Sequence, residues 1–140
     1  MPRKMVRADV RAFLDEKPGW MMLSSQGRGG FPHTVPIGYF REGDQIFMGC
    51  RDGTQKVVNI ERDSRVALCI EDGSSMGELR GVLLRGKAEI VREESSRLEI
   101  SRLAASQRGV PKHELPEVAT PGSVFIKLSS YSITSWDYSG

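Results

Sequence analysis

Histidine, cysteine and long apolar runs are scarce in this chain of 140 residues, and each scarcity excludes a class of protein. The two cysteines, Cys50 and Cys69, form no CxxC pair, and with only two histidines beside them no metal site is expected. Such thiols favour a reducing compartment. No apolar stretch approaches the roughly 20 residues of a membrane span, and the basic segment 1–5 is not followed by a signal-peptide core. A cytoplasmic protein without a membrane partner is therefore expected.

Net charge is also small. The 20 basic residues are nearly balanced by 18 acidic residues, which leaves a formal net charge of +2. This bias is too weak to indicate nucleic-acid binding. The hydrophobic content of 39% and the charged content of 27% are typical of a globular protein, and the length fits one domain that spans residues 1–140.

Alternating apolar residues predict a fold made mainly of β-strands. The clearest pattern covers residues 79–91, where Val82, Leu84 and Ile90 on one face alternate with charged residues on the other. Similar patterns predict strands over 20–25, 31–40, 45–48, 65–71 and 124–136, the last broken at a Ser-Ser pair. Helices are expected near 6–16, 56–62 and 96–108, the third with a capping box of Ser96 and Glu99. Because sheets of this size tend to close on themselves, the sequence predicts a small antiparallel β-barrel of six or seven strands with short helices outside.

One stretch, residues 49–59, combines features that suit an anion. A predicted strand ends there in an Asp-Gly turn, Thr54 is a suitable helix N-cap, and Lys56 lies in the first helical turn. Free N–H groups, the helix dipole and the ammonium would converge on one point, which is suited to a phosphate. The alternative is an ordinary solvated lysine beside a turn, because no strict phosphate-loop pattern is present.

Four segments, taken in order, resemble the pyridoxamine 5′-phosphate oxidase-like, flavin-binding split-barrel proteins. They are residues 30–38 (GFPHTVPIG), 53–60 (GTQKVVNI), 64–68 (SRVAL) and 79–89 (LRGVLLRGKAE), and residues 131–136 resemble the family's last strand. Each segment is short and degenerate, and the order and spacing of all of them carry the likeness. The resemblance implies a split β-barrel and a homodimer that binds FMN, or the deazaflavin F420, in two clefts between the subunits.

The resemblance also implies which residues bind the cofactor. The segment Val35, Pro36, Ile37 and Gly38 would lie along the flavin ring, with Pro36 at a sheet edge or bulge and Gly38 allowing close approach. The phosphate would be bound by Lys56, by Thr54 and by backbone N–H groups. Further candidates are Cys50, where relatives often carry threonine, Arg51, Gln55, Asn59, Arg80 and Trp136.

Several of these roles have structural alternatives. Asn59 either bonds the phosphate or caps strand packing, and Trp136 either stacks near the ring or fills the barrel mouth. Arg80, with Arg85 and Lys87, either attracts an anionic cofactor tail across the dimer or forms a solvated strand face. His33 is either an acid or base or, more simply, a structural or ring-edge contact, so no catalytic residue is assigned.

Departures from the family pattern reduce the range of activities that we expect. The C-terminal arginine–histidine signature of true pyridoxamine phosphate oxidases is missing, and Gly81 stands where those enzymes place a glutamine. Vitamin B6 oxidation is therefore not expected. The expected function is an FMN-dependent oxidoreductase that transfers hydride to or from a small-molecule substrate. The alternatives are an F420-dependent reductase and a non-catalytic flavin- or haem-binding module, for which only His33 and His113 could be axial ligands.

Overall fold

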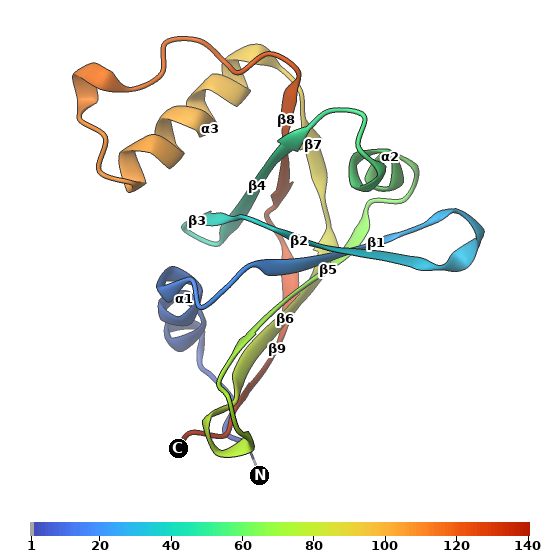
Figure 1. Ribbon diagram of the computed structural model, residues 1–140, viewed down its shortest axis with the longest axis vertical. Helices are drawn as coiled ribbons and strands as arrows, with labels where there is room; N and C mark the ends of the chain where they lie inside the picture. The colour runs from blue at the N-terminus through green and yellow to red at the C-terminus, as the bar shows by residue number, and fades with distance from the viewer. Residues whose placement is uncertain (1) are drawn as a thin grey trace.

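The computed structural model describes residues 2–140, and within that range the chain forms nine β-strands in two antiparallel sheets (Figure 1). The five-stranded sheet has the order β2-β1-β5-β6-β9, and the four-stranded sheet has the order β3-β4-β8-β7. The strands are β1 (Met21–Gln26), β2 (Pro32–Ile37), β3 (Phe40–Glu42), β4 (Gln45–Arg51), β5 (Arg65–Asp72), β6 (Arg80–Lys87), β7 (Glu89–Val91), β8 (Ser123–Leu128) and β9 (Tyr131–Asp137). The predicted antiparallel split barrel is confirmed.

Nine strands form instead of the six or seven predicted, because three predicted strands are each divided between the sheets. The stretch 31–40 breaks at Gly38 and Tyr39 into β2 and β3, the stretch 79–91 breaks at Ala88 into β6 and β7, and the stretch 124–136 breaks at its Ser-Ser pair into β8 and β9. At Ala88 the backbone N–H bonds the Ser64 carbonyl at 2.8 Å, outside either ladder. Both sheets bury their inner faces in one core, so apolar alternation continues through the first two breaks and hides them.

That core is built from the inward residues of both sheets. Leu23, Leu68 and Leu84 from the five-stranded sheet meet Met48 and Ile126 from the four-stranded sheet, and none of the five has any exposed surface. A second, smaller cluster lies on the other face of the four-stranded sheet. It contains the stacked rings of Phe40 and Phe47, whose centroids are 5.1 Å apart, with Val91 and Ile100.

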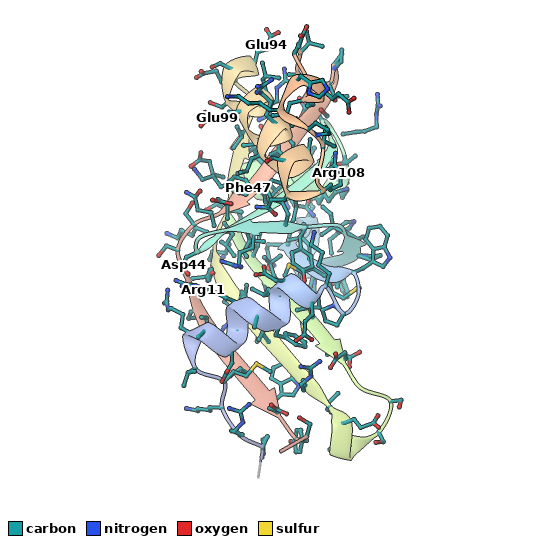
Figure 2. All side chains as sticks on the ribbon, turned by 90° about the vertical axis from the view of Figure 1, so that its left-hand side faces the viewer. Arg11, Asp44, Phe47, Glu94, Glu99 and Arg108 are labelled. Carbon is teal, nitrogen blue, oxygen red and sulfur yellow. The ribbon has the colours of Figure 1, made fainter. Side chains whose placement is uncertain are left out.

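Three α-helices pack outside the sheets: α1 (Arg7–Glu16), α2 (Gln55–Arg62) and α3 (Glu94–Gln107). α1 buries Val10, Phe13 and Leu14, and Arg11 bonds Asp44 of the β3–β4 turn at 2.8 Å (Figure 2). α3 covers the smaller cluster and begins two residues before Ser96, so the predicted capping box is wrong. Short 3₁₀ turns lie at Arg28–Gly30 (η1), Met76–Glu78 (η2) and Lys112–Glu114 (η3). Within residues 2–140, none of the helices has the length and apolar character to cross a bilayer.

Candidate functional site

The predicted strand, turn and helix over residues 45–62 are present. β4 ends at Arg51, the chain turns at Asp52 and Gly53, and α2 begins at Gln55. Gly53 has a φ of +77°, a left-handed conformation that favours glycine. The Asp52 carboxylate accepts the Gly53 N–H at 2.8 Å, which fixes the turn. We name the region formed by Cys50, Thr54, Lys56 and the first turn of α2 the α2 corner.

The N-terminus of α2 has no side-chain cap. Thr54 occupies the N-cap position, but its hydroxyl donates to the Arg51 carbonyl at 3.0 Å and does not accept from the helix. The expected capping bond is therefore absent in this structure. The first N–H groups of a helix have no partner within the helix, so those of α2 are available to an anion.

Lys56 is half-buried beside this helix end. Its ammonium forms no ion pair or hydrogen bond with any side chain among residues 2–140. The Cys50 thiol lies close enough to respond to it: burial raises the pKa of the thiol, while the Lys56 ammonium and a hydrogen bond with Thr54 oppose that rise. The fold thus brings three of the predicted phosphate-binding side chains together.

The acidic residue nearest in sequence to the α2 corner is neutralised. Arg92 donates to Asp52 at 2.8 Å and to Glu61 of α2 at the same distance. The hydrogen bond from Arg92 lowers the pKa of the Asp52 carboxyl. Because Arg92 balances Asp52, the field at the helix end stays favourable to negative charge.

Asn59 and Gln55 are engaged with each other. Asn59 has no exposed surface, and its amide donates to the Ser25 hydroxyl of β1 at 3.1 Å while its oxygen accepts from Gln55 at 2.7 Å. A second donor to that oxygen is Arg62 at 3.3 Å. Of the two roles expected for Asn59, the structure shows the one in packing, since these bonds tie α2 to the sheet. A phosphate contact remains a prediction.

β2 is an edge strand, one of the settings expected for Pro36, and pairs only with β1 among the described strands. Val35 is half-buried, Pro36 is exposed and Ile37 is buried. Gly38 follows, and a Cβ built on it would lie 3.3 Å from the indole ring of Trp20, which is 69% exposed. The close approach expected at Gly38 is thus made here by Trp20, and the free backbone edge of β2 is open to a ligand.

Arg80 and Trp136 lie at the other end of the barrel. Arg80 bonds Asp72 at 2.6 Å and Glu16 at 3.1 Å, and its guanidinium lies 4.9 Å from the centre of the Phe13 ring. Trp136 packs on Gly81, where an added Cβ would stand 2.4 Å from the indole. Within one chain neither residue reaches the α2 corner, whereas Arg51 ends the strand that leads into it. A contact across a dimer remains a prediction for both.

The two histidines lie in different settings. His33 is half-buried on β2, and its Nδ1 is the one buried side-chain polar atom of residues 2–140 that has no hydrogen-bond partner. His113 is exposed on η3, 3.7 Å from Glu114. No group of three or more potential metal ligands occurs in the described part of the chain.

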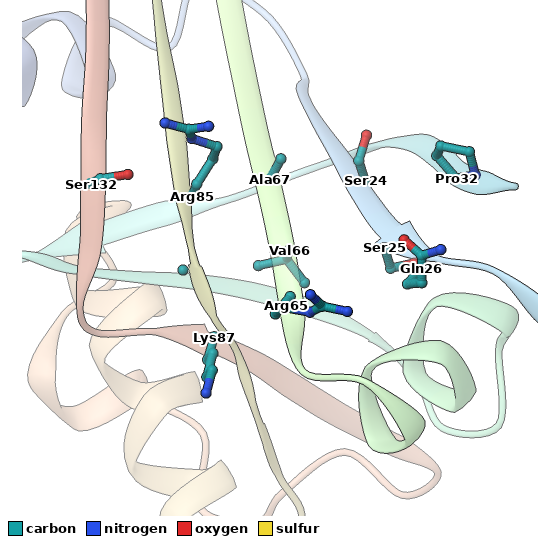
Figure 3. A pocket seen from close by; sticks show the side chains of 11 residues that line it. Ser24, Ser25, Gln26, Pro32, Arg65, Val66, Ala67, Arg85, Lys87 and Ser132 are labelled. Atoms are coloured by element: carbon teal, nitrogen blue, oxygen red, sulfur yellow. The ribbon is translucent and has the colours of Figure 1, made fainter. Parts of the chain in front are cut away.

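Two cavities were not predicted from the sequence. One, of about 410 Å³, lies between the four-stranded sheet and α3 and touches Gly38 and Gly49, so it adjoins both predicted cofactor segments. The other, of about 510 Å³, lies on the five-stranded sheet (Figure 3). We name the second the sheet hollow; it is lined by Ser24, Ser25, Gln26, Pro32, Arg65, Val66, Ala67, Arg85, Gly86, Lys87 and Ser132. The alternation of Arg85 and Lys87 in one strand was its only signal in the sequence.

The family model described as pyridoxamine 5′-phosphate oxidase matches residues 6–130. No curated protein matches the chain in sequence. The structure of the conserved hypothetical protein Rv2991 from Mycobacterium tuberculosis is similar with a TM-score of 0.80 and 25% identity, over 96% of this chain and 86% of that one.

Two further structures share the fold at lower identity. One is an F420 reductase, with a TM-score of 0.61 and 19% identity over 84% of this chain and 90% of that one. The other is an FAD- and haem-binding protein from Mycobacterium smegmatis, with a TM-score of 0.71 and 18% identity over 94% of this chain and 71% of that one.

Proposed function

Because the chain belongs to the pyridoxamine 5′-phosphate oxidase family, we propose that it is a flavin-dependent oxidoreductase that binds FMN at a homodimer interface and transfers hydride to or from a small molecule. One observation carries the proposal: the unpaired ammonium of Lys56 lies beside an uncapped helix N-terminus. Folded proteins rarely leave a half-buried cation and free N–H groups side by side without a partner. A phosphate satisfies both.

The residues present fit the phosphate end of a flavin. Lys56 supplies the positive charge, the first N–H groups of α2 supply directed donors, and the dipole of this eight-residue helix adds to both. Cys50 stands beside Lys56 and offers a weaker donor than a hydroxyl would. Asp52 is held by Arg92 and so does not compete for Lys56.

The ring of the flavin would meet a different environment from that of its phosphate. The free edge of β2 offers backbone groups between Val35 and Gly38, and Pro36 removes one donor from that edge. The cavity between the four-stranded sheet and α3 is lined in part by Gly38 and would provide room for a small substrate. Hydride transfer is chemistry that a flavin would supply when bound, and these residues would bind and orient it.

F420 is the second candidate cofactor, supported by the likeness to an F420 reductase. A haem-binding or storage module ranks below both, because His113 is exposed on a short turn and His33 is a single half-buried ligand. The absorption spectrum of the protein as isolated separates the three. Flavin bands support FMN, a deazaflavin spectrum supports F420, and a Soret band supports haem.

Replacing Lys56 tests the phosphate assignment. We expect Lys56→Ala to weaken cofactor binding by about 1.5–3 kcal/mol, the scale of a charge-assisted hydrogen bond. Titration of apoprotein followed by flavin fluorescence measures it. Lys112→Ala is the matched control, since Lys112 is an exposed lysine on η3. Equal affinity for the Lys56 variant and the control would contradict the assignment.

The dimer is a separate prediction. The outer face of the five-stranded sheet exposes Trp20 and Met22 by 69% and 39%, and half-buried Cys69 and Leu83 continue that surface. Contiguous apolar surface of this kind favours association. Sedimentation should give about twice the chain mass of 15.6 kDa, and Met22→Lys should shift it toward the monomer. A wild-type monomer that still binds flavin would rule out the shared cleft.

A further inference from the structure

The cavity between the four-stranded sheet and α3, which we name the α3 cavity, has aromatic walls. Its volume is about 410 Å³, and Phe40, Phe47 and Phe125 of the sheet line one side of it. The first two rings are stacked, with their centroids 5.1 Å apart. Ala104 of α3 also lines the cavity, and its side chain is too short to fill the space. Because aromatic rings pack well against other rings, these walls suit a flat apolar group.

The α3 cavity lies away from the face that we assign to the dimer. None of its lining residues, within the part of the chain that the structure describes, belongs to the five-stranded sheet. The walls come from the four-stranded sheet, from α3, from the loop that follows α3 and from Gly38 and Tyr39. Trp20 of the proposed dimer face touches the lining at Gly38. A partner subunit on that face would therefore border the cavity at Gly38 and leave the other walls uncovered.

Two arginines of α3 hold the loop that forms one of the walls. Arg97 donates to the Thr120 carbonyl at 3.0 Å, and Arg102 donates to the Pro116 carbonyl at 2.7 Å. Both Pro116 and Thr120 line the α3 cavity. The wall is therefore fixed before any ligand arrives, which lowers the entropic cost of binding.

Arg108, at the C-terminal end of α3, differs from those two arginines. It is the one charged residue among the described residues that line the α3 cavity, and it is exposed. Its guanidinium forms no ion pair with a carboxylate among residues 2–140. Ser101 lies two helical turns earlier on the same face of α3 and lines the cavity as well. In Figure 2 Phe47 and Arg108 lie at the same end of α3. The cavity thus combines aromatic walls with a single unbalanced cation.

We propose that the α3 cavity binds an aromatic carboxylate, a flat ring that carries one negative charge. The ring lies against Phe47 and Phe125, and the guanidinium of Arg108 binds the carboxylate through two parallel hydrogen bonds. One cation in the lining matches one negative charge on the ligand, and the Ser101 hydroxyl is available to a polar substituent of the ring. The assignment names the substrate class of the proposed oxidoreductase and rests on that function, although binding itself requires no turnover.

Titration of the ¹⁵N-labelled protein, as isolated, with trans-cinnamate tests the proposal. We expect the amide signals of Gly49 and Ala104 to shift, and Arg108→Gln to weaken cinnamate binding at least about tenfold. Arg108→Lys keeps the charge but loses the paired geometry, so its affinity should be intermediate. Lys112→Gln, four residues further on, is the matched control and should stay within about twofold. Unshifted Gly49 and Ala104 signals, or equal weakening by the control, would overturn the proposal.

Cinnamamide, which has the same ring but no charge, separates the two parts of the site. It should bind wild type at least about tenfold more weakly than cinnamate, and Arg108→Gln should change its affinity less than about twofold. Ala104→Leu keeps the guanidinium but fills the cavity, so it should weaken both ligands. Thermal melting of each variant verifies the fold. Equal affinity of wild type for cinnamate and cinnamamide would rule out recognition of a carboxylate.

Flavin binding by the wild-type protein is measured separately, so the two proposals can fail independently. If the protein binds flavin but cinnamate causes no shift at Gly49 and Ala104, the substrate class is wrong and the proposed function stands. If cinnamate binds through Arg108 in a protein that takes up neither FMN nor F420, the carboxylate site is supported and the proposed function is wrong.

Discussion

The two ends of the β5–β6 pair use positive charge in opposite ways. At one end Arg80 is held by Asp72 and Glu16 and lies over the Phe13 ring, while Arg3 bonds Asp137 at 2.8 Å. At the other end lie the α2 corner and the sheet hollow, where Lys56, Arg85 and Lys87 have no acidic partner among the described residues. Figure 1 shows both chain termini at the first end and α2 near the second.

The difference separates cations that stabilise the fold from cations that remain available to ligands. A paired arginine contributes modestly to stability and its charge is already balanced. An unpaired lysine at a helix N-terminus adds nothing comparable to stability, but it gains a strong interaction when an anion arrives. The proposed phosphate site therefore lies at the end with unpaired charge. We call the end near the chain termini, where the cations are paired, the structural end.

The largest effect on stability should come from replacing Asn59, whose hydrogen bonds hold α2 against the five-stranded sheet. We expect Asn59→Ala to lower the free energy of unfolding by about 2 kcal/mol, because Ser25 and Gln55 lose their buried partner. Urea denaturation measures this. Gln55→Ala removes one bond from a more exposed position and should cost less. If both variants were equally stable, the buried network would not be what holds the α2 corner in place.

The second-largest effect on stability should come from a change at Gly81, at the structural end. A Cβ there would meet the Trp136 ring at 2.4 Å, so Gly81→Ala should displace the indole and cost about 1–2 kcal/mol. Tryptophan fluorescence and urea denaturation report the displacement and its cost. Gly77→Ala, where no atom lies within 4 Å of the added Cβ, should be close to neutral. Equal stability of the two variants would mean that Trp136 does not rest on Gly81.

The smallest effect should be a dependence of stability on pH at the structural end. Hydrogen bonds from Ser139, and then Arg3, lower the pKa of Asp137 to about 2. A lowered pKa stabilises the folded state above the ordinary pKa of aspartate, and this stabilisation is lost as the pH falls toward 2. Asp137→Asn should therefore be less stable than wild type at pH 6, with the gap narrowing by pH 2.5. A constant gap would assign the difference to packing.

Much of this molecule could be predicted from local sequence. The Asp-Gly turn, Thr54 at the N-cap position and the apolar spacing of Val57 and Ile60 correctly placed α2. Pro36 left an edge, a bulge or a ligand-facing backbone open, and the structure shows the edge. These features are readable because each depends on residues within one or two turns of each other. The order of the family segments added the split barrel, which the pattern of any one strand could not supply.

The remaining features depend on residues far apart in the chain. Nothing near Thr54 shows that its hydroxyl donates to Arg51, or that Asn59 is buried against Ser25, 34 residues earlier. Nor does any local pattern pair Arg80 with Glu16 or bring Ser24, Ala67 and Ser132 into one row. Such contacts arise only when strands and helices pack.

The sequence by itself determined the strand-rich barrel, its helices and the place of Lys56 in the first turn of α2, because backbone propensity and apolar periodicity act over a few residues. Only the tertiary structure decided where strands cross between sheets, which cations are neutralised and where the hollow lies. Charge balance depends on which carboxylate packs beside which cation, and that is a property of the folded chain as a whole.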